Sequence, residues 1–273
     1  MARRTLAEAF AQTRAVQAQR DTSKRRISRA KREALAPRPP AAAITAYLSV
    51  METYAERVER AVEKRVLSLL PVAGSGDPLD RVALERGLAD LAADLDALAL
   101  RSRRSALAAG KRVSRHGQVE VARMMKVSVP NDIRTGVSIE AFADRNVELV
   151  RKAGREQVAR IRTAIADHAE GDSMRRDIQD ALWVSRNRGK MIAKDQPHKF
   201  HAQTIEAWLQ VAGSEEYFWC TRKDEVTRPG HRILDGTRHR YDKPPNTGRL
   251  EGHNRPGQAA GCRCRMVPVE AFY

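Results

Sequence analysis

Aromatic residues and cysteines are scarce in this chain of 273 residues. Phe, Tyr and Trp make up 5% of it, whereas charged residues make up 31%. That balance is more typical of long solvent-exposed helices than of a compact enzyme. The three cysteines are odd in number and do not suggest the disulfide scaffold of a small secreted domain. We therefore expect a protein that is made and kept in a reducing cytoplasm.

The chain also lacks any long apolar run. The first ten residues, MARRTLAEAF, contain no apolar segment of signal-peptide length. A stretch of about 18 consecutive apolar residues, the length needed to span a bilayer, does not occur anywhere. The sequence therefore predicts that no membrane is required.

Positive charge is plentiful and unevenly distributed. The net charge is +16, and residues 1–40 carry eleven basic against three acidic residues, a net +8. We predict that residues 1–40 form a basic arm, ending in a Pro-rich linker at 36–40, that binds a polyanion such as DNA or an acidic protein surface. A solvated tail without a partner is the alternative. The candidate binding residues are Arg20, Lys24, Arg25, Arg26, Arg29, Lys31 and Arg32.

Apolar residues at steps of three and four predict two helices within residues 41–126. The first stripe ends before the break at 71–76, and Asp77-Pro78 is predicted to cap and begin the second helix. Because neither stripe can be buried alone, we expect an antiparallel hairpin; oligomerisation through the leucines is the alternative. The stripes are Ile44, Leu48, Met51, Ala55, Val58, Val62, Val66 and Leu69, then Leu84, Leu88, Leu91, Leu95 and Leu98.

The pattern is helical again from 127 to 213, after loosening into connections around 110–117 and 127–136. We predict one helix from Phe142 to about Gly171 and a short one around Trp183. A third runs from about 187–189 to Val211, with a kink or break at Pro197. Short strands are predicted at 217–221, 239–241 and 262–267, with a long polar loop at 242–261. The fold class is therefore mainly α: long antiparallel amphipathic helices with a small C-terminal α+β domain at 214–273.

The most distinctive pattern lies in that C-terminal domain, in YFWCTRKDEVTRPGHRILDG at 217–236 and GCRCR at 261–265. An aromatic strand is followed by a charged turn, a Pro-Gly break, a histidine and an Asp-Gly turn. We interpret these residues as a structural constellation: Asp224 pairs with Arg228, and His231 bonds a neighbouring loop. The motif residues are Trp219, Thr221, Asp224, Arg228, Pro229, His231, Asp235, Gly236, His253, Cys262 and Cys264.

This ordered set resembles the phage Mu F-like head morphogenesis family, the minor head proteins of tailed phages. The stretches FADRNVELV from Phe142 and MIAKDQ from Met191 extend the resemblance over roughly the second half of the chain. The resemblance implies a structural minor capsid protein with no enzymatic role, associated with the portal and acting in procapsid assembly and in genome packaging or delivery. The implied partners are the phage portal protein, major capsid or scaffold proteins and packaged DNA. The implied location is the virion, inside a head assembled in the host cytoplasm.

Cys262 and Cys264 allow two interpretations. With His231 and His253, or with Cys220, they could complete a tetrahedral zinc site. Other members of the resembled family carry C-x-x-C where this chain has Arg228 and His231, and arginine cannot bind a metal. In a strand, however, residues 262 and 264 share one face and would simply pack inward. We favour packing and predict no cofactor, with zinc as the alternative.

A DNA-acting, possibly metal-dependent enzyme is the alternative function. His253-Asn254 could belong to an HNH-like nuclease, and Asp224, Arg228, His231 and Asp235 could form an acid–base cluster. An HNH site needs a second, correctly spaced His/Asn pair, which the sequence does not offer. We therefore assign no catalytic residue.

Overall fold

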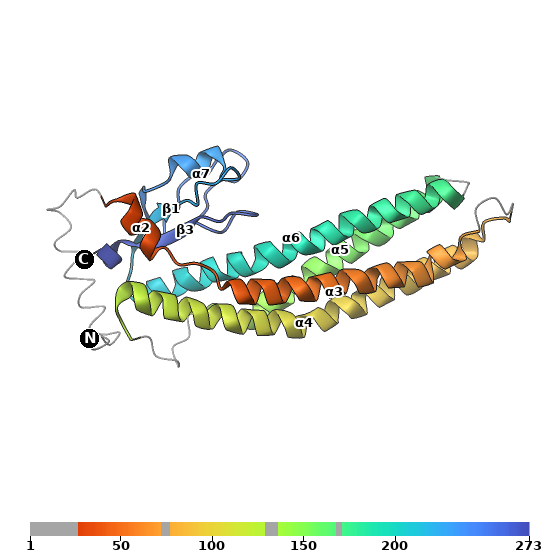
Figure 1. The fold of residues 1–273 in the computed structure, drawn as a ribbon, viewed down its shortest axis with the longest axis horizontal. Helices are drawn as coiled ribbons and strands as arrows, with labels where there is room; N and C mark the ends of the chain where they lie inside the picture. Colours follow the sequence, from red (N-terminus) through yellow and green to blue (C-terminus); the bar gives the residue numbers. More distant parts are fainter. Residues whose placement is uncertain (1–26, 72–76, 129–135, 168–170, 273) are drawn as a thin grey trace. The chain divides into compact units, whose positions relative to one another are not determined.

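Long helices dominate the computed structural model, which describes residues 27–71, 77–128, 136–167 and 171–272. A small antiparallel sheet and a one-turn helix follow them near the C-terminus (Figure 1). This confirms the predicted fold class. The helices are α2 (Arg29–Leu35), α3 (Ala41–Arg65), α4 (Arg81–Met125), α5 (Ile139–Asp167), α6 (Gly171–Val211) and α7 (Pro229–Ile233); the strands are β1 (Glu216–Cys220), β2 (Arg238–Arg240) and β3 (Arg265–Pro268); and the 3₁₀ turns are η2 (Leu67–Leu69) and η3 (Val269–Phe272).

Contacts divide the chain into two compact units, each assembled from segments that are distant in sequence. Unit 1 comprises residues 1–43, 110–139 and 195–273, and unit 2 comprises 44–109 and 140–194. Helices α4 and α6 each contribute one part to each unit. The boundaries predicted at 40, 126 and 213 follow the chain in order and stay a prediction. In the described ranges, no helix has the length and apolar character to cross a membrane.

Unit 2 is held together by the two predicted stripes, packed with residues of α5 and α6. Leu84, Leu88 and Leu91 are fully buried, and they join Val62 of α3 and Ile161 of α5 in one apolar cluster. The predicted packing of the leucine stripe within the chain is therefore confirmed. A buried hydrogen bond of 3.0 Å from the Tyr47 hydroxyl to Asn146 Oδ1 adds a specific link between α3 and α5.

Two details of the first stripe differ from the prediction. Ala43 and Tyr47 are buried in place of Ile44 and Leu48, so the stripe at the start of α3 is shifted by one residue. Leu69, at the end of the stripe, is 38% exposed because the chain leaves α3 through η2.

The predicted start of the second helix is wrong. Residues 77–80 are not helical, and α4 begins at Arg81. The side chain of Asp80 accepts a hydrogen bond of 2.9 Å from the Ala83 N–H, so Asp80 acts as the N-cap in place of Asp77. Both aspartates fit the sequence rule equally well.

Three predicted breaks are also absent from the described helices. Helix α4 continues through 110–117, and α6 continues through 187–189 and Pro197 without a break. Gly117 permits close packing against α6, because a Cβ atom there would lie 2.7 Å from Thr204 Cγ2. A glycine chosen for close packing and one that ends a helix look alike in sequence.

The sheet of unit 1 has the strand order β2-β1-β3, with β1 antiparallel to both neighbours. Alternation along β1 buries Tyr217 and Trp219 fully, and Trp219 faces Met266 of β3 in the register. These side chains pack with the ends of α4 and α6 in a second apolar cluster. The third predicted strand is shorter than expected: residues 262–264 lie before β3, which begins at Arg265.

The segment 36–40, predicted as a linker, is part of unit 1. Ala36 is 3% exposed and packs with Cys220 and Val267. Its carbonyl accepts a hydrogen bond of 3.1 Å from Arg265 Nη1. Pro37 is also buried. The segment that was predicted only to end the helix therefore also attaches the chain to the sheet, through Ala36.

Candidate functional site: a buried histidine and two cysteines

Three buried side chains of the C-terminal motif converge. His231 Nδ1 lies 3.4 Å from Cys262 Sγ and 3.4 Å from Cys264 Sγ. The three potential ligand atoms all lie within 4.8 Å of one another. The residues are 2%, 5% and 6% exposed. Histidine and cysteine are the side chains that bind soft divalent metals, so the cluster has the chemical character of a metal site.

The local sequence explains how His231 is presented. Arg228 is the N-cap of α7 and Pro229 occupies the first turn, where a proline loses no hydrogen bond. Gly230 allows the loop to approach, because a Cβ atom there would lie 2.1 Å from the Thr247 carbonyl oxygen. The Trp219 ring meets the imidazole of His231 edge-on, at 5.4 Å between ring centroids. This contact helps to orient the imidazole.

The far nitrogen of the imidazole is bound by the loop. His231 Nε2 lies 2.7 Å from Glu251 Oε2, and the other carboxylate oxygen of Glu251 lies 2.9 Å from Arg228 Nε. The predicted contact between His231 and a neighbouring loop is therefore present. Burial opposes ionisation of Glu251, but the contacts with His231 and Arg228 outweigh it and lower the pKa of this carboxyl.

The predicted Asp224–Arg228 pair is wrong. Arg228 binds Glu251, and its Nη2 also donates a hydrogen bond of 2.6 Å to the Ala260 carbonyl. Asp224 instead lies 2.9 Å from Arg263 Nη2 and accepts a hydrogen bond from the Thr227 hydroxyl. Spacing of one helical turn suggested the pair, but residues 224–228 are not helical.

The two thiols titrate together. Cys262 Sγ accepts hydrogen bonds from Cys264 and from the Gly257 N–H, at 3.4 Å, and these lower the pKa of Cys262 to about 6 in spite of burial. The same contact, together with burial, raises the pKa of Cys264 above its ordinary value. The contact between the two sulfurs therefore favours ionisation of Cys262 over ionisation of Cys264.

His253, the fourth residue of the predicted zinc alternative, is placed elsewhere. Its Nδ1 lies 2.8 Å from the Pro244 carbonyl, and it forms an isolated bridge with Asn246. Asn254 donates hydrogen bonds to the Thr247 hydroxyl and to the Glu251 carbonyl. Both side chains of the suggested HNH-like pair thus hold the loop 242–261 in shape.

Thr221, Asp235 and Gly236 form a second part of the motif. Asp235 Oδ1 accepts hydrogen bonds of 2.9 Å from both the N–H and the hydroxyl of Thr221, and Lys223 Nζ lies 2.8 Å from Oδ2. Gly236 adopts φ +80°, and its N–H donates a hydrogen bond of 2.7 Å to the Trp219 carbonyl. The Asp-Gly turn therefore fastens the segment after α7 to the end of β1.

Asp235→Asn should lower the free energy of unfolding at neutral pH by about 1–3 kcal/mol, because the ion pair with Lys223 is lost. Burial opposes ionisation of Asp235, but the bonds from Lys223 and Thr221 outweigh it and lower the pKa of this carboxyl. The stabilisation is therefore present above the unfolded pKa of about 3.9. It disappears as the pH falls through the folded value. Urea denaturation of both proteins at pH 7 and near pH 3 measures this.

The control for that comparison is Asp242→Asn, which alters an exposed carboxylate paired with Arg240. It should change stability little at either pH. If the difference between the parent protein and Asp235→Asn were as large near pH 3 as at pH 7, the ionised carboxylate would not be the stabilising group.

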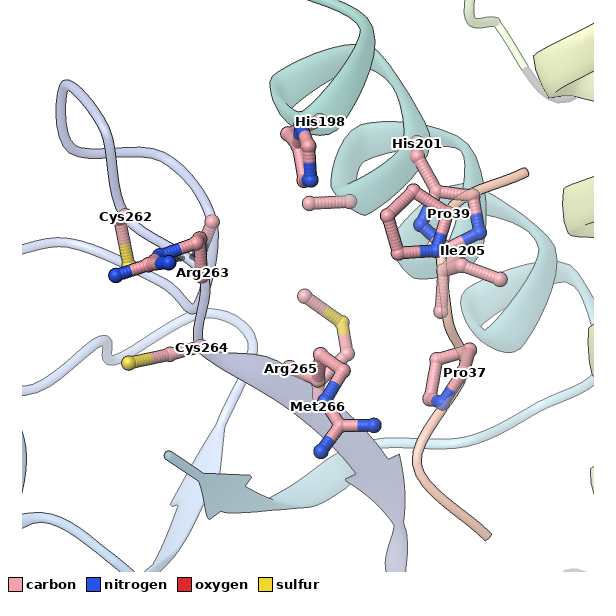
Figure 2. Close-up of a pocket in the computed structure, with 12 residues that line it drawn as sticks. Pro37, Pro39, His198, His201, Ile205, Cys262, Arg263, Cys264, Arg265 and Met266 are labelled. Atoms are coloured by element: carbon pink, nitrogen blue, oxygen red, sulfur yellow. Dashed lines mark hydrogen bonds between the residues drawn. The ribbon is translucent and has the colours of Figure 1, made fainter. Parts of the chain in front are cut away.

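A pocket within unit 1 is lined in part by Cys262 and Cys264. Figure 2 shows Pro37, Pro39, His201 and Met266 among the side chains that line it, and the sulfur atom of Cys264 pointing away from it. His201 is 4% exposed, and burial, with His116 and His198 nearby, lowers the pKa of its imidazole to about 3. The pocket therefore presents a neutral histidine and does not include the sulfur atom of Cys264 as a reactive group.

Sequence reasoning missed two residues of this region. Glu251, which holds His231 and Arg228 together, was one charged residue among many in a polar loop, although it directly precedes the Gly252-His253 pair of the motif. His201 lies within the helix that was predicted to end at Val211, and nothing in the sequence singled it out as a buried residue. The structure shows that Glu251 contacts His231 and that His201 lines a pocket together with Cys262 and Cys264.

Of the seven candidate binding residues of the arm, Arg20, Lys24, Arg25 and Arg26 lie outside the described residues. The other three are engaged within the protein. Arg29 pairs with Glu33 at 2.6 Å, Lys31 Nζ lies 5.5 Å from the centre of the Phe272 ring, and Arg32 donates a hydrogen bond to the Ile27 carbonyl.

Comparison with known proteins agrees with the motif. Residues 156–267 match the family model described as Phage Mu protein F like protein. A protein of Haemophilus influenzae, described as an uncharacterized protein, is 26% identical over 135 residues, covering 48% of this chain and only 29% of the relative. No solved structure matches the chain significantly. The matched region contains α7, β1, β2, most of β3 and the His231–Cys262–Cys264 cluster, and this part of the chain is similar to the phage Mu F-like family of head morphogenesis proteins.

Proposed function

We propose that this protein is a portal-associated minor head protein of a tailed phage, acting in procapsid assembly and in genome packaging or delivery. The family match over residues 156–267 is the observation that carries the proposal, since this family suggests a role in phage head morphogenesis. The proposed partners are the portal protein, the major capsid or scaffold proteins and packaged DNA. The proposed location is the inside of the virion head.

Unit 2 is the part that we expect to dock on the portal. Two large apolar side chains of α6, Trp183 and Met191, are 68% and 69% exposed. They are eight residues apart, which separates them by about two turns along the helix and about 80° around its axis. Exposed aromatic and methionine side chains are enriched where proteins bind one another, which supports docking through this part of α6.

Co-expression with the tagged portal protein of the same phage tests the proposal. The full chain should co-purify with the portal, and imaging should place it on portal-containing procapsids. Trp183→Ala should keep the parent melting temperature and reduce co-purification, whereas Val82→Ala, at a 71% exposed position of α4, should change neither. No association with portals or procapsids would refute the proposal. A metal-dependent DNA-degrading activity abolished by His253→Ala would favour the enzyme instead.

The basic arm supplies a separate prediction about DNA. Residues 1–26 hold seven basic and two acidic residues, and a deletion should stop at 26 because Ala36 and Pro37 are buried in unit 1. Without residues 1–26 the protein should bind short duplex DNA more weakly at low salt. The slope of log K against log [salt] should become shallower by up to about 6, at roughly 0.9 for each phosphate neutralised. Fluorescence anisotropy across a salt series measures both.

A full-length variant with the seven basic residues changed to Gln is the matched control, because it removes charge without removing chain. It should bind DNA as weakly as the deletion. Unchanged affinity and slope in both variants would exclude the arm as a DNA-binding segment.

A further inference from the structure

We propose that His231, Cys262 and Cys264 bind a single zinc ion that fastens α7 and the loop 242–261 to the start of β3. The carrying observation is the distance between the donor atoms: His231 Nδ1 lies 3.4 Å from each sulfur. With zinc–nitrogen and zinc–sulfur bonds of about 2.0 and 2.3 Å, a tetrahedral ion holds nitrogen and sulfur ligands about 3.5 Å apart. Both nitrogen–sulfur distances therefore match such a site, and the three donor atoms all lie within 4.8 Å of one another.

The contact between His231 Nε2 and Glu251 also supports a zinc site. Glu251 Oε2 lies 2.7 Å from His231 Nε2, so this nitrogen carries the proton and donates it to the carboxylate. The lone pair of a neutral imidazole is then on Nδ1, which faces the two sulfurs. A carboxylate that binds the far nitrogen of a histidine is the usual second partner of a metal-binding imidazole. Arg228, at 2.9 Å from the same carboxylate, holds Glu251 in place.

Packing without a metal leaves the cluster poorly satisfied. Nδ1 would face only the sulfur atoms of Cys262 and Cys264, which form weak hydrogen bonds, in a place where all three side chains are nearly inaccessible to water. Buried polar groups in folded proteins normally have good partners. A zinc ion would satisfy all three donor atoms at once, and thiolate with imidazole is the donor set that zinc prefers.

The sulfur atom of Cys262 is also held by the backbone. The Gly257 N–H donates a hydrogen bond of 3.4 Å to Cys262 Sγ, and Gly257 adopts φ +83°, a conformation that favours glycine. The Gly261 N–H, just before Cys262, donates a hydrogen bond of 2.6 Å to Asp195 Oδ1. Among the described residues, the three side chains of the cluster are the ones that supply ligand atoms.

Metal analysis of the full chain tests the proposal. Protein purified in a phosphine reductant, without chelator, should contain about one zinc ion per chain. A strong chelator should remove it and lower the melting temperature, and added Zn²⁺ should restore both. Cobalt in place of zinc should show the visible bands of tetrahedral thiolate coordination. Absence of stoichiometric zinc, with a melting temperature indifferent to chelator and to added Zn²⁺, would overturn the proposal.

Three kinds of variant locate the ion. Cys262→Ser and Cys264→Ser should each lose zinc, whereas Cys220→Ser should keep it, because buried Cys220 packs with Ala36 and Val267 and is not part of the cluster. Glu251→Gln leaves every ligand in place and should weaken zinc binding 10- to 100-fold. Because this variant keeps the three donors, it remains informative if the cysteine variants fold poorly. Zinc retained in full by both Cys262→Ser and Cys264→Ser, or parent affinity in Glu251→Gln, would contradict the site.

Discussion

Leu88→Asp is expected to lower the free energy of unfolding by at least about 3 kcal/mol, because it places an unpaired carboxylate in an apolar core. Leu88 is fully buried in unit 2, in the cluster with Val62 and Ile161. Many domains are stable by only about 5–15 kcal/mol, so this change removes a large share of the margin. Urea denaturation followed by far-UV circular dichroism measures the loss.

Val82→Asp is the matched control, since Val82 lies near the start of the same helix and is 71% exposed. A carboxylate there faces water and lies close to the positive end of the helix dipole. This variant should keep the parent stability. If Leu88→Asp were as stable as Val82→Asp, the leucine stripe could not be the packed seam of unit 2.

The leucine stripe also illustrates what the sequence predicts well. Regular spacing of Leu84, Leu88, Leu91 and Leu95 fixes one face of a helix, and only burial of that face can offset the entropy of ordering it. The strand predicted at 217–221 is also present, as β1 at Glu216–Cys220, with Tyr217 and Trp219 buried. Long periodic segments are therefore predictable because many residues carry the same signal.

Helix ends and interruptions are less predictable because each depends on one residue. Asp77 and Asp80 are equally good caps in sequence, and only the packing of α4 decides between them. Gly117 is compatible with a break or with close packing against Thr204, and the second is realised. Pro197 removes a single donor, which a long packed helix tolerates at a cost.

The candidate site was half visible in the sequence. Cys262, Cys264 and His231 stood out as residues with metal-binding chemistry, but their approach depends on the path of the loop 242–261. That path is set by glycines with positive φ, such as Gly252 and Gly257, and by Glu251. A polar loop has no periodicity from which such contacts could be derived.

The second large effect is expected for Trp219→Ala, which should lower the free energy of unfolding by about 3–5 kcal/mol. Trp219 is fully buried in the middle strand of the sheet and is among the largest buried side chains of the described residues. It pairs with Met266 across to β3 and meets His231 and His239 edge-on, at 5.4 and 6.5 Å between ring centroids. Removing the indole opens a cavity that touches all of these neighbours, and the sheet cannot collapse to fill it.

Trp183→Ala makes the matched comparison, because it removes an indole that is 68% exposed on α6. It should leave the melting temperature nearly unchanged, while Trp219→Ala lowers it by many degrees. Trp219→Phe should fall between the two, since a smaller ring still fills part of the space and keeps an edge towards His231. Calorimetry of the three variants gives the order directly. A melting temperature of Trp219→Ala equal to that of Trp183→Ala would mean that the motif tryptophan does not support the sheet. The orientation of the His231 imidazole would then need another source, because the contact with Trp219 is one of the two that orient it.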